Sequence, residues 1–233
     1  MALPIDMTAG MHAALRGRAE AWRFLTDFAA YWRAPLQADD GYDSALLDAA
    51  ERRLGLQLPP ALREAYTLLG RRDDLCRNQD RLLRPEELLV HEGALVYRAE
   101  NQGAAHWGVL LDDLPAEDPP TVVRPDLADK AAECWEPWAR RLSVAIVELV
   151  MSETALYEGD GRSDGADLPD GVLGMFEPLP TLLPDGNGYG SAWFLGDDVL
   201  VHVYDGCWLT VRGRSSEALD AVRDAVPGDW VNW

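Results

Sequence analysis

Apolar residues in the first seventy positions recur with the spacing of helices. From Met11 to Trp32 they return every three or four residues, which predicts one amphipathic helix that ends at Ala34-Pro35. The same spacing predicts shorter helices over residues 44–54 and 60–69. The chain therefore opens as a group of helices.

The middle of the chain changes to the two-residue alternation of strands. Residues 95–99 and 107–111 alternate in this way across a short glycine-containing connection, which predicts an antiparallel hairpin. In the second strand, Trp107, Val109 and Leu111 share one face, and we expect that face to meet the core.

Loops and one strongly apolar helix follow the hairpin. The acidic, proline-rich residues 112–120 predict an exposed loop, after which residues 121–124 return as a short strand. Residues 142–156 are apolar on most sides, so we expect a well-buried helix. Residues 158–187 are rich in acids, Gly and Pro and lack sustained periodicity, although 172–176 would suit a short strand.

The last part of the chain predicts three closely spaced strands and a helix. The strands cover residues 192–195, 199–204 and 208–212, and Asp205-Gly206 between the last two is a strong hairpin signal. A final helix is expected over residues 215–226, with its two serines as the cap.

This order of elements predicts an α+β fold, because helices and strands come in separate runs rather than in alternation. We expect a central, mostly antiparallel sheet flanked by helices. Residues 1–38 would form an N-terminal helical extension packed on a single domain of residues 39–233. The acidic segment at about 158–187 would be an insertion in that domain.

The composition of the chain restricts the kinds of partner that the protein is expected to bind. The net charge of −19 argues against direct nucleic-acid binding, which needs clustered Lys and Arg. A basic protein partner suits the charge, and an aid to solubility is the simpler alternative. We expect no membrane association, because no apolar run approaches the roughly 20 residues of a membrane span. Three cysteines without a CxxC pair and the lack of a secretory signal favour a cytoplasmic location.

Candidate chemistry is sparse. Residues 161–165 match G-x-S-x-G, but acidic coil is expected around them instead of the strand and helix that a nucleophile elbow needs. His106 and His202 lie on predicted strands and either could be a general base, although packed histidines are more common at such positions. Residues from Asp185 resemble the start of a calcium loop, but Gly196 stands where the closing acid should be. We therefore predict no catalytic residues, no metal site and no cofactor.

Two stretches of the chain together resemble a known family. Asp43 to Gly70 is similar to the opening of SUKH superfamily domains, with Leu54-Gly55 ending one helix and Leu58-Pro59 preceding the next. Glu100-Asn101-Gln102-Gly103, Trp107-Gly108 and Glu117-Asp118-Pro119-Pro120 resemble a pattern common in bacterial members. The likeness covers residues 43–226. It implies an α+β domain and a non-enzymatic role, since bacterial members are mostly associated with immunity against polymorphic toxins, many of them nucleases, and fungal relatives regulate cell-wall synthesis.

The resulting hypothesis is a cytoplasmic immunity-type protein that occludes a cognate toxin with a basic surface. The alternatives are a regulatory or scaffolding protein-binding module and, less favoured, an enzyme. Nine carboxylates in the two acidic segments are the candidate partner-binding residues. They are Asp112, Asp113, Glu117, Asp118, Glu158, Asp160, Asp164, Asp167 and Asp170.

Overall fold

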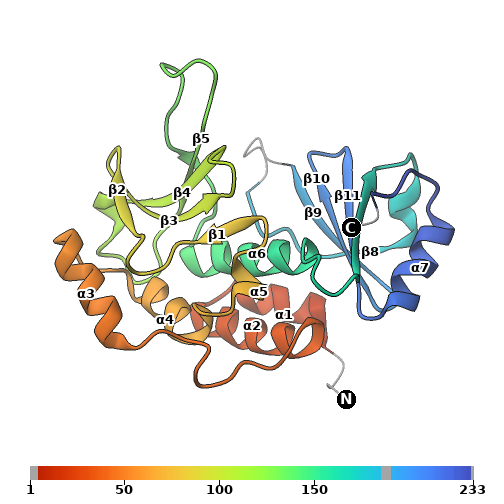
Figure 1. Cartoon of the computed structure of the whole chain (residues 1–233), viewed down its shortest axis with the longest axis horizontal. Coiled ribbons are helices and arrows are strands. Elements are labelled where there is room, and N and C mark those ends of the chain that lie inside the picture. The colour runs from red at the N-terminus through yellow and green to blue at the C-terminus, as the bar shows by residue number, and fades with distance from the viewer. Residues whose placement is uncertain (1–4, 185–189, 232–233) are drawn as a thin grey trace.

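The computed structural model describes residues 5–184 and 190–231. In these residues seven α-helices accompany two antiparallel sheets, which confirms the α+β class (Figure 1). The helices are α1 (Met7–Ala14), α2 (Arg18–Trp32), α3 (Ser44–Leu54), α4 (Pro60–Leu69), α5 (Asp73–Cys76), α6 (Leu142–Ala155) and α7 (Ser216–Ala225). Two short 3₁₀ helices are η1 (Leu111–Asp113) and η2 (Val172–Met175).

The strands are divided between a larger and a smaller sheet. The first sheet contains β1 (Asp80–Leu82), β2 (Leu89–His91), β3 (Ala94–Glu100), β4 (Ala105–Leu110), β5 (Val122–Pro125) and β6 (Glu136–Pro137). The second contains β7 (Ser163–Asp167), β8 (Glu177–Pro178), β9 (Ser191–Gly196), β10 (Val199–Tyr204) and β11 (Trp208–Gly213).

Helix α6 is the element on which both halves of the molecule pack. All of its residues are buried, as its nearly continuous apolar sequence predicts. Figure 1 shows α6 running between the two sheets, with α1 and α2 along its lower side. Two of its buried residues, Glu148 and Glu153, are acidic. Because a buried charge is costly unless it is paired, their surroundings bear directly on function.

The first sheet has the order β1-β3-β4-β5-β6, and β2 pairs with the other end of β3. The predicted hairpin is confirmed as β3 and β4. Trp107 and Val109 are buried as expected, but the prediction for Leu111 is wrong, since its side chain is 38% exposed. Strand β4 ends at Leu110, and Leu111 begins η1, so the strand alternation no longer sets its direction.

The second sheet has the order β7-β11-β10-β9-β8. The three predicted C-terminal strands are confirmed, and Asp205 and Gly206 both adopt positive φ in the β10–β11 turn. Helix α7 is confirmed too, with the Ser215 hydroxyl accepting the N–H of Ala218. It packs Leu219 against the sheet.

Two predictions about the acidic segment are wrong. Residues 163–167 form β7, which is paired along its length with β11, so the segment is part of the second sheet there. Residues 172–176 do not form a strand, because 172–175 are 3₁₀ helix. The sequence of β7 consists largely of acids and glycine and has no apolar alternation, so it gives no strand signal. The strand forms because β7 pairs with β11, 40 or more residues away.

The N-terminal segment forms two helices where the sequence predicts one. Helix α1 ends at Ala14, and α2 begins at Arg18 after Gly17, whose extended backbone interrupts the helical geometry. Met11 on α1 and Phe28 on α2 are fully buried and belong to the same core cluster as α6. The extension therefore contributes directly to the main core.

The described helices include no span with the length and apolar character that crossing a membrane requires.

Candidate functional site

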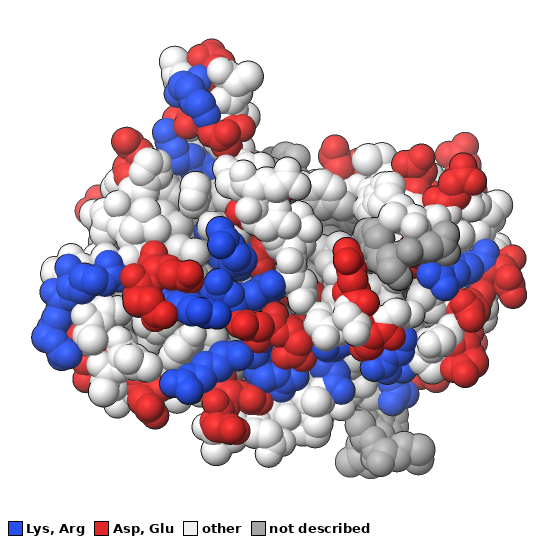
Figure 2. Space-filling view, viewed as in Figure 1, with Lys and Arg blue, Asp and Glu red and all other residues white. Residues whose placement is uncertain are grey.

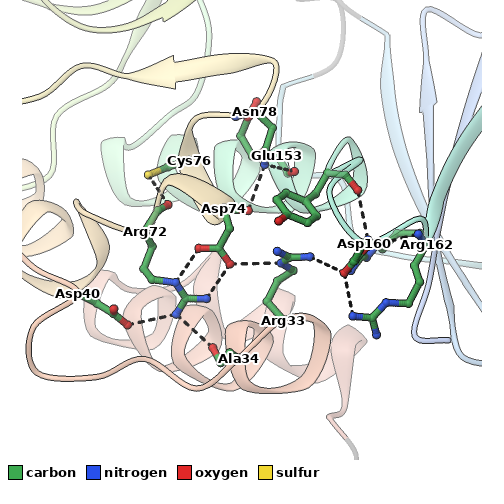
Figure 3. Close-up of polar contacts among 12 residues, drawn as sticks. Arg33, Ala34, Asp40, Arg72, Asp74, Cys76, Asn78, Glu153, Asp160 and Arg162 are labelled. Atoms are coloured by element: carbon green, nitrogen blue, oxygen red, sulfur yellow. Dashed lines mark hydrogen bonds and ion pairs between the residues drawn. The ribbon is translucent and has the colours of Figure 1, made fainter. Parts of the chain in front are cut away.

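Asp160 is partly buried and is held by arginines from three separate segments. Arg212 on β11 is fully buried and donates Nη1 and Nη2 to the two carboxylate oxygens of Asp160, at 2.6 and 2.7 Å. Arg162 and Arg33 also donate to this carboxylate, at 2.8 and 2.9 Å (Figure 3). Burial raises the pKa of Asp160, but the hydrogen bonds and charge of Arg212 outweigh that effect and hold the pKa well below its usual range.

The same ion-pair network reaches the N-terminal helices. Arg33, at the end of α2, lies between Asp160 and Asp74, and its guanidinium sits 3.5 Å from the ring centre of Tyr157. Arg72 extends the network from Asp74 to Asp40. On this face Figure 2 shows Lys and Arg interleaved with Asp and Glu across the lower middle of the molecule. Asp160 therefore joins three parts of the fold, and its prediction as a partner-binding residue is not supported by its position.

Two further predicted carboxylates face inward. Asp164 on β7 is fully buried and accepts from Nε and Nη2 of Arg223 on α7. Asp118 accepts the backbone N–H of Ser143 at 2.8 Å and its hydroxyl at 2.6 Å, in the first turn of α6. A carboxylate at a helix N-terminus satisfies free N–H groups and stabilises the helix. Both acids have structural contacts that account for them.

The remaining acids of the first segment point outward from an ordered loop. Asp112 is exposed, Asp113 is half-buried, and neither side chain forms an ion pair within the described part of the chain. Glu117 is exposed, with a contact of 3.4 Å to Arg18. Its backbone carbonyl accepts from Ala61 N–H and from the Arg18 side chain, which fixes the loop against α4 and α2. We call residues 111–117 the acidic loop.

A groove runs beside the acidic loop. It has a volume of about 620 Å³ and is lined by Leu111, Leu114 and Pro115 from the loop and by the connection between α3 and α4. Asp48 and Glu51 lie on its edge, where both bind Arg63. The loop thus combines the exposed apolar residues Leu111 and Pro115 with the exposed carboxylates of Asp112 and Glu117.

The outward acids of the second segment lie elsewhere. Glu158, Asp167 and Asp170 are exposed and form no ion pair among the described residues. Glu158 follows the C-terminal end of α6, whereas the acidic loop approaches the N-terminal end through Asp118. Fourteen helical residues at about 1.5 Å each separate the two ends by about 20 Å. The nine predicted residues therefore do not form one surface.

His106 and the serine of the G-x-S-x-G match both have structural contacts in this fold. His106 is half-buried beside His91, and burial lowers its pKa. Ser163 of the G-x-S-x-G match lies buried in β7, with Nη1 of Arg212 at 3.2 Å, so the strand–turn–helix geometry of a nucleophile elbow is not present there. The first five residues of the suggested calcium loop, 185–189, lie outside those that the structure describes, and its last six form strand β9 (Ser191–Gly196). No three His, Cys, Asp or Glu side chains of the described chain are grouped so as to hold a metal ion.

A cavity of about 410 Å³ lies between the two sheets and against α6. We call it the central cavity. The first sheet contributes Arg98 and Trp107, α6 contributes Glu148 and Glu153, and the second sheet contributes aromatic residues of β10 and β11. Such a volume is within the range of small-molecule sites. The sequence suggested none of these residues as a group.

Arg98 organises one wall of the central cavity. Its Nε donates to Asp80 at 3.0 Å, its Nη1 donates to Glu148 at 2.7 Å, and the guanidinium lies 4.1 Å from the ring centre of Trp107. Burial raises the pKa of Asp80 despite the attraction of Arg98. One guanidinium is thus paired with two buried carboxylates, so these three side chains together have an excess of acidic groups.

Glu153 adds a third carboxylate to this wall. It accepts the backbone N–H groups of Asn78, Gln79 and Asp80, the last two at 2.9 and 2.8 Å. Burial raises its pKa to about 7, although these N–H groups favour the ionised form. The carboxylate therefore titrates close to neutral pH.

His202 lies on the opposite wall, in β10. Its ring is stacked on Trp193 with centroids 4.1 Å apart, and its Nε2 is 2.9 Å from the Ser191 hydroxyl. Burial lowers its pKa to about 4, so the ring is neutral at pH 7. The described carboxylates form no hydrogen bond with this ring, so it lacks the acid that would orient a general base.

Comparisons with protein-family models, curated proteins and solved structures gave no match.

Proposed function

We propose that this protein is a non-enzymatic, immunity-type protein that binds a basic toxin domain through the acidic loop. The observation that carries the proposal is the loop itself. Its carboxylates project from an ordered backbone, beside the exposed Leu111 and an open groove. Apolar contact surrounded by polar groups is the common anatomy of a protein interface.

The charge balance of the molecule supports a basic partner. Most of its 21 Lys and Arg residues already form internal ion pairs, so the surplus of acids is carried by outward side chains such as Asp112 and Asp113. An uncompensated acidic surface attracts a cationic partner and accelerates its association. Toxins that cleave nucleic acids have basic substrate clefts, which an acidic loop is suited to occlude.

The fixed conformation of the acidic loop also supports this function. Its backbone is held by Ala61 and Arg18, and Asp118 at its end is fixed to α6. A preorganised loop loses little conformational entropy when it binds. The resemblance to SUKH immunity proteins suggests the same function, since two of its motifs border this loop.

Co-expression with a toxin encoded beside the gene tests the proposal. The toxin is induced in a bacterial host with the wild-type protein, with Asp112→Lys/Asp113→Lys/Glu117→Lys, or with the matched control Asp27→Lys/Asp39→Lys/Asp224→Lys. The control makes the same charge change at exposed residues that form no ion pairs in the described chain. We expect protection from wild type and control and its loss in the loop variant.

Each of the other possible results would contradict a part of this proposal. If wild-type protein gives no protection, the immunity function is wrong and a regulatory client is the better interpretation. If loop and control variants lose protection equally, net charge rather than the loop is responsible. Protection that depends instead on Glu158, Asp167 and Asp170 would move the interface to the other end of α6.

A further inference from the structure

The central cavity has two chemically different walls. Asp80, Glu148 and Glu153 stand on the first-sheet and α6 side, and Glu100 also lines the cavity there. On the second-sheet side the lining residues of β9 to β11 carry aromatic and hydroxyl side chains and no acid or base that is charged at pH 7. The cavity therefore presents an anionic wall opposite an aromatic one.

Arg98 neutralises only part of the anionic wall. Among the described residues that line the cavity, Arg98 is the one cation, against four carboxylates. Its three donor nitrogens are engaged with Asp80 and Glu148. Glu153 and Glu100 bind N–H groups but form no ion pair in the described chain. A cation entering the cavity would meet Glu100 and Glu153, which form no ion pair in the described chain, and its charge would favour the ionised form of Glu153.

The aromatic wall can bind the same cation. Trp208 and Tyr204 line it, and Tyr204 is 46% exposed, so the aromatic wall extends to the molecular surface. Aromatic faces attract ammonium and guanidinium groups, most strongly where water is excluded. Arg98 over Trp107 is an example of this chemistry on the opposite side of the cavity.

Trp107 and Trp138 form an apolar part of the cavity lining. Both are at least 94% buried, and their rings meet edge to face with centroids 5.7 Å apart. Apolar walls with a few polar groups are typical of small-molecule sites.

We propose that the central cavity binds a small organic cation, an amine on a flat apolar body. The ammonium group would lie between the carboxylates of α6 and the rings of Tyr204 and Trp208. The apolar body would fill the remaining volume beside Trp107. This site is separate from the acidic loop and does not depend on toxin binding.

Titration calorimetry with three indoles of one shape tests the charge requirement without any mutation. The probes are tryptamine, indole-3-ethanol and indole-3-acetate, which carry a positive, zero and negative charge. We expect tryptamine to bind at least about tenfold more tightly than the alcohol, since a desolvated cation–aromatic contact contributes about one such factor. The acetate should not bind. Equal binding of the alcohol, or no binding of tryptamine at millimolar concentration, would overturn the proposal.

Single substitutions test whether tryptamine binds in the central cavity. Trp208→Ala should weaken tryptamine binding at least about tenfold, whereas Trp135→Ala, a half-buried tryptophan outside the cavity, should leave it unchanged. Tyr204→Ala, at the exposed end of the aromatic wall, is the second variant if Trp208→Ala does not fold. Equal weakening by Trp135→Ala would place the site elsewhere. Binding of N-acetyl-lysinamide as tight as that of tryptamine would overturn the requirement for a flat apolar body.

Discussion

Arg212 and Asp160 form a two-point ion pair that joins the end of α6 to the second sheet. Both terminal nitrogens of the buried guanidinium donate to the carboxylate, and Ser163 is the other side chain within reach of Nη1. A two-point arginine–carboxylate pair fixes orientation as well as charge. The acid that the sequence suggested for partner binding is thus a structural element.

Replacing this acid should destabilise the fold. Asp160→Asn leaves Arg212 as a buried charge without its partner, so we expect the free energy of unfolding to fall by about 3 kcal/mol, near the lower end for breaking such a pair. Urea unfolding measures the change. Glu158→Gln, an exposed neighbour, is the control and should change stability by no more than about 0.5 kcal/mol. Equal effects of the two variants would contradict the structural role of Asp160.

Asp118 should stabilise α6 rather than bind a partner. Asp118→Ala removes the acceptor for the Ser143 N–H and hydroxyl, and loss of such a cap costs about 1 kcal/mol. Asp112→Ala in the same loop should cost less than about 0.5 kcal/mol, because Asp112 has no ion pair in the described chain. Chemical denaturation of both variants measures the difference, and a larger loss from Asp112→Ala would reverse the assignment.

His202 should make the fold sensitive to mild acid. An unfolded histidine takes up a proton near pH 6.5, whereas folded His202 resists protonation until about pH 4. Its contribution is therefore present above pH 6.5 and is lost as pH falls from 6.5 to 4. The shift corresponds to about 2–3 kcal/mol, allowing for the partial access of water from the cavity.

Glu153 acts in the opposite direction over nearly the same range. Its folded pKa of about 7 lies above that of an unfolded glutamate, so this group loses stability as pH rises from about 4.5 to 7. The two effects partly cancel in the wild type. The difference in unfolding free energy between wild type and His202→Asn isolates the histidine and should grow by about 2–3 kcal/mol from pH 4 to pH 7. A difference independent of pH would contradict the buried neutral ring.

Local sequence patterns predict the elements of this fold well. The apolar run of α6, the alternation in β3 and the Asp205-Gly206 turn each encode their structure in a few neighbouring residues. Strand β7 was missed because its pairing is supplied by β11 and its sequence lacks apolar alternation. The break at Gly17 was missed because the apolar spacing continues across it.

The candidate sites are less predictable because their contacts connect distant residues. The sequence does not distinguish the outward Asp112 from the inward Asp160. The arginines that bind Asp160, Arg33 and Arg212, lie more than 50 residues from it on either side. The central cavity depends on two sheets and α6 coming together. The one available signal was the unusual presence of Glu148 and Glu153 in an apolar helix.

The association rate of the purified protein with the toxin encoded beside its gene tests the central claim most directly. Stopped-flow measurements at low salt compare wild type, the acidic-loop triple lysine variant and the Asp27/Asp39/Asp224 triple lysine control. We expect the loop variant to associate at least about tenfold more slowly, with a smaller change in dissociation, and the control to stay within about threefold of wild type. Equal association rates for the loop and control variants would contradict an acidic loop that recognises a basic partner.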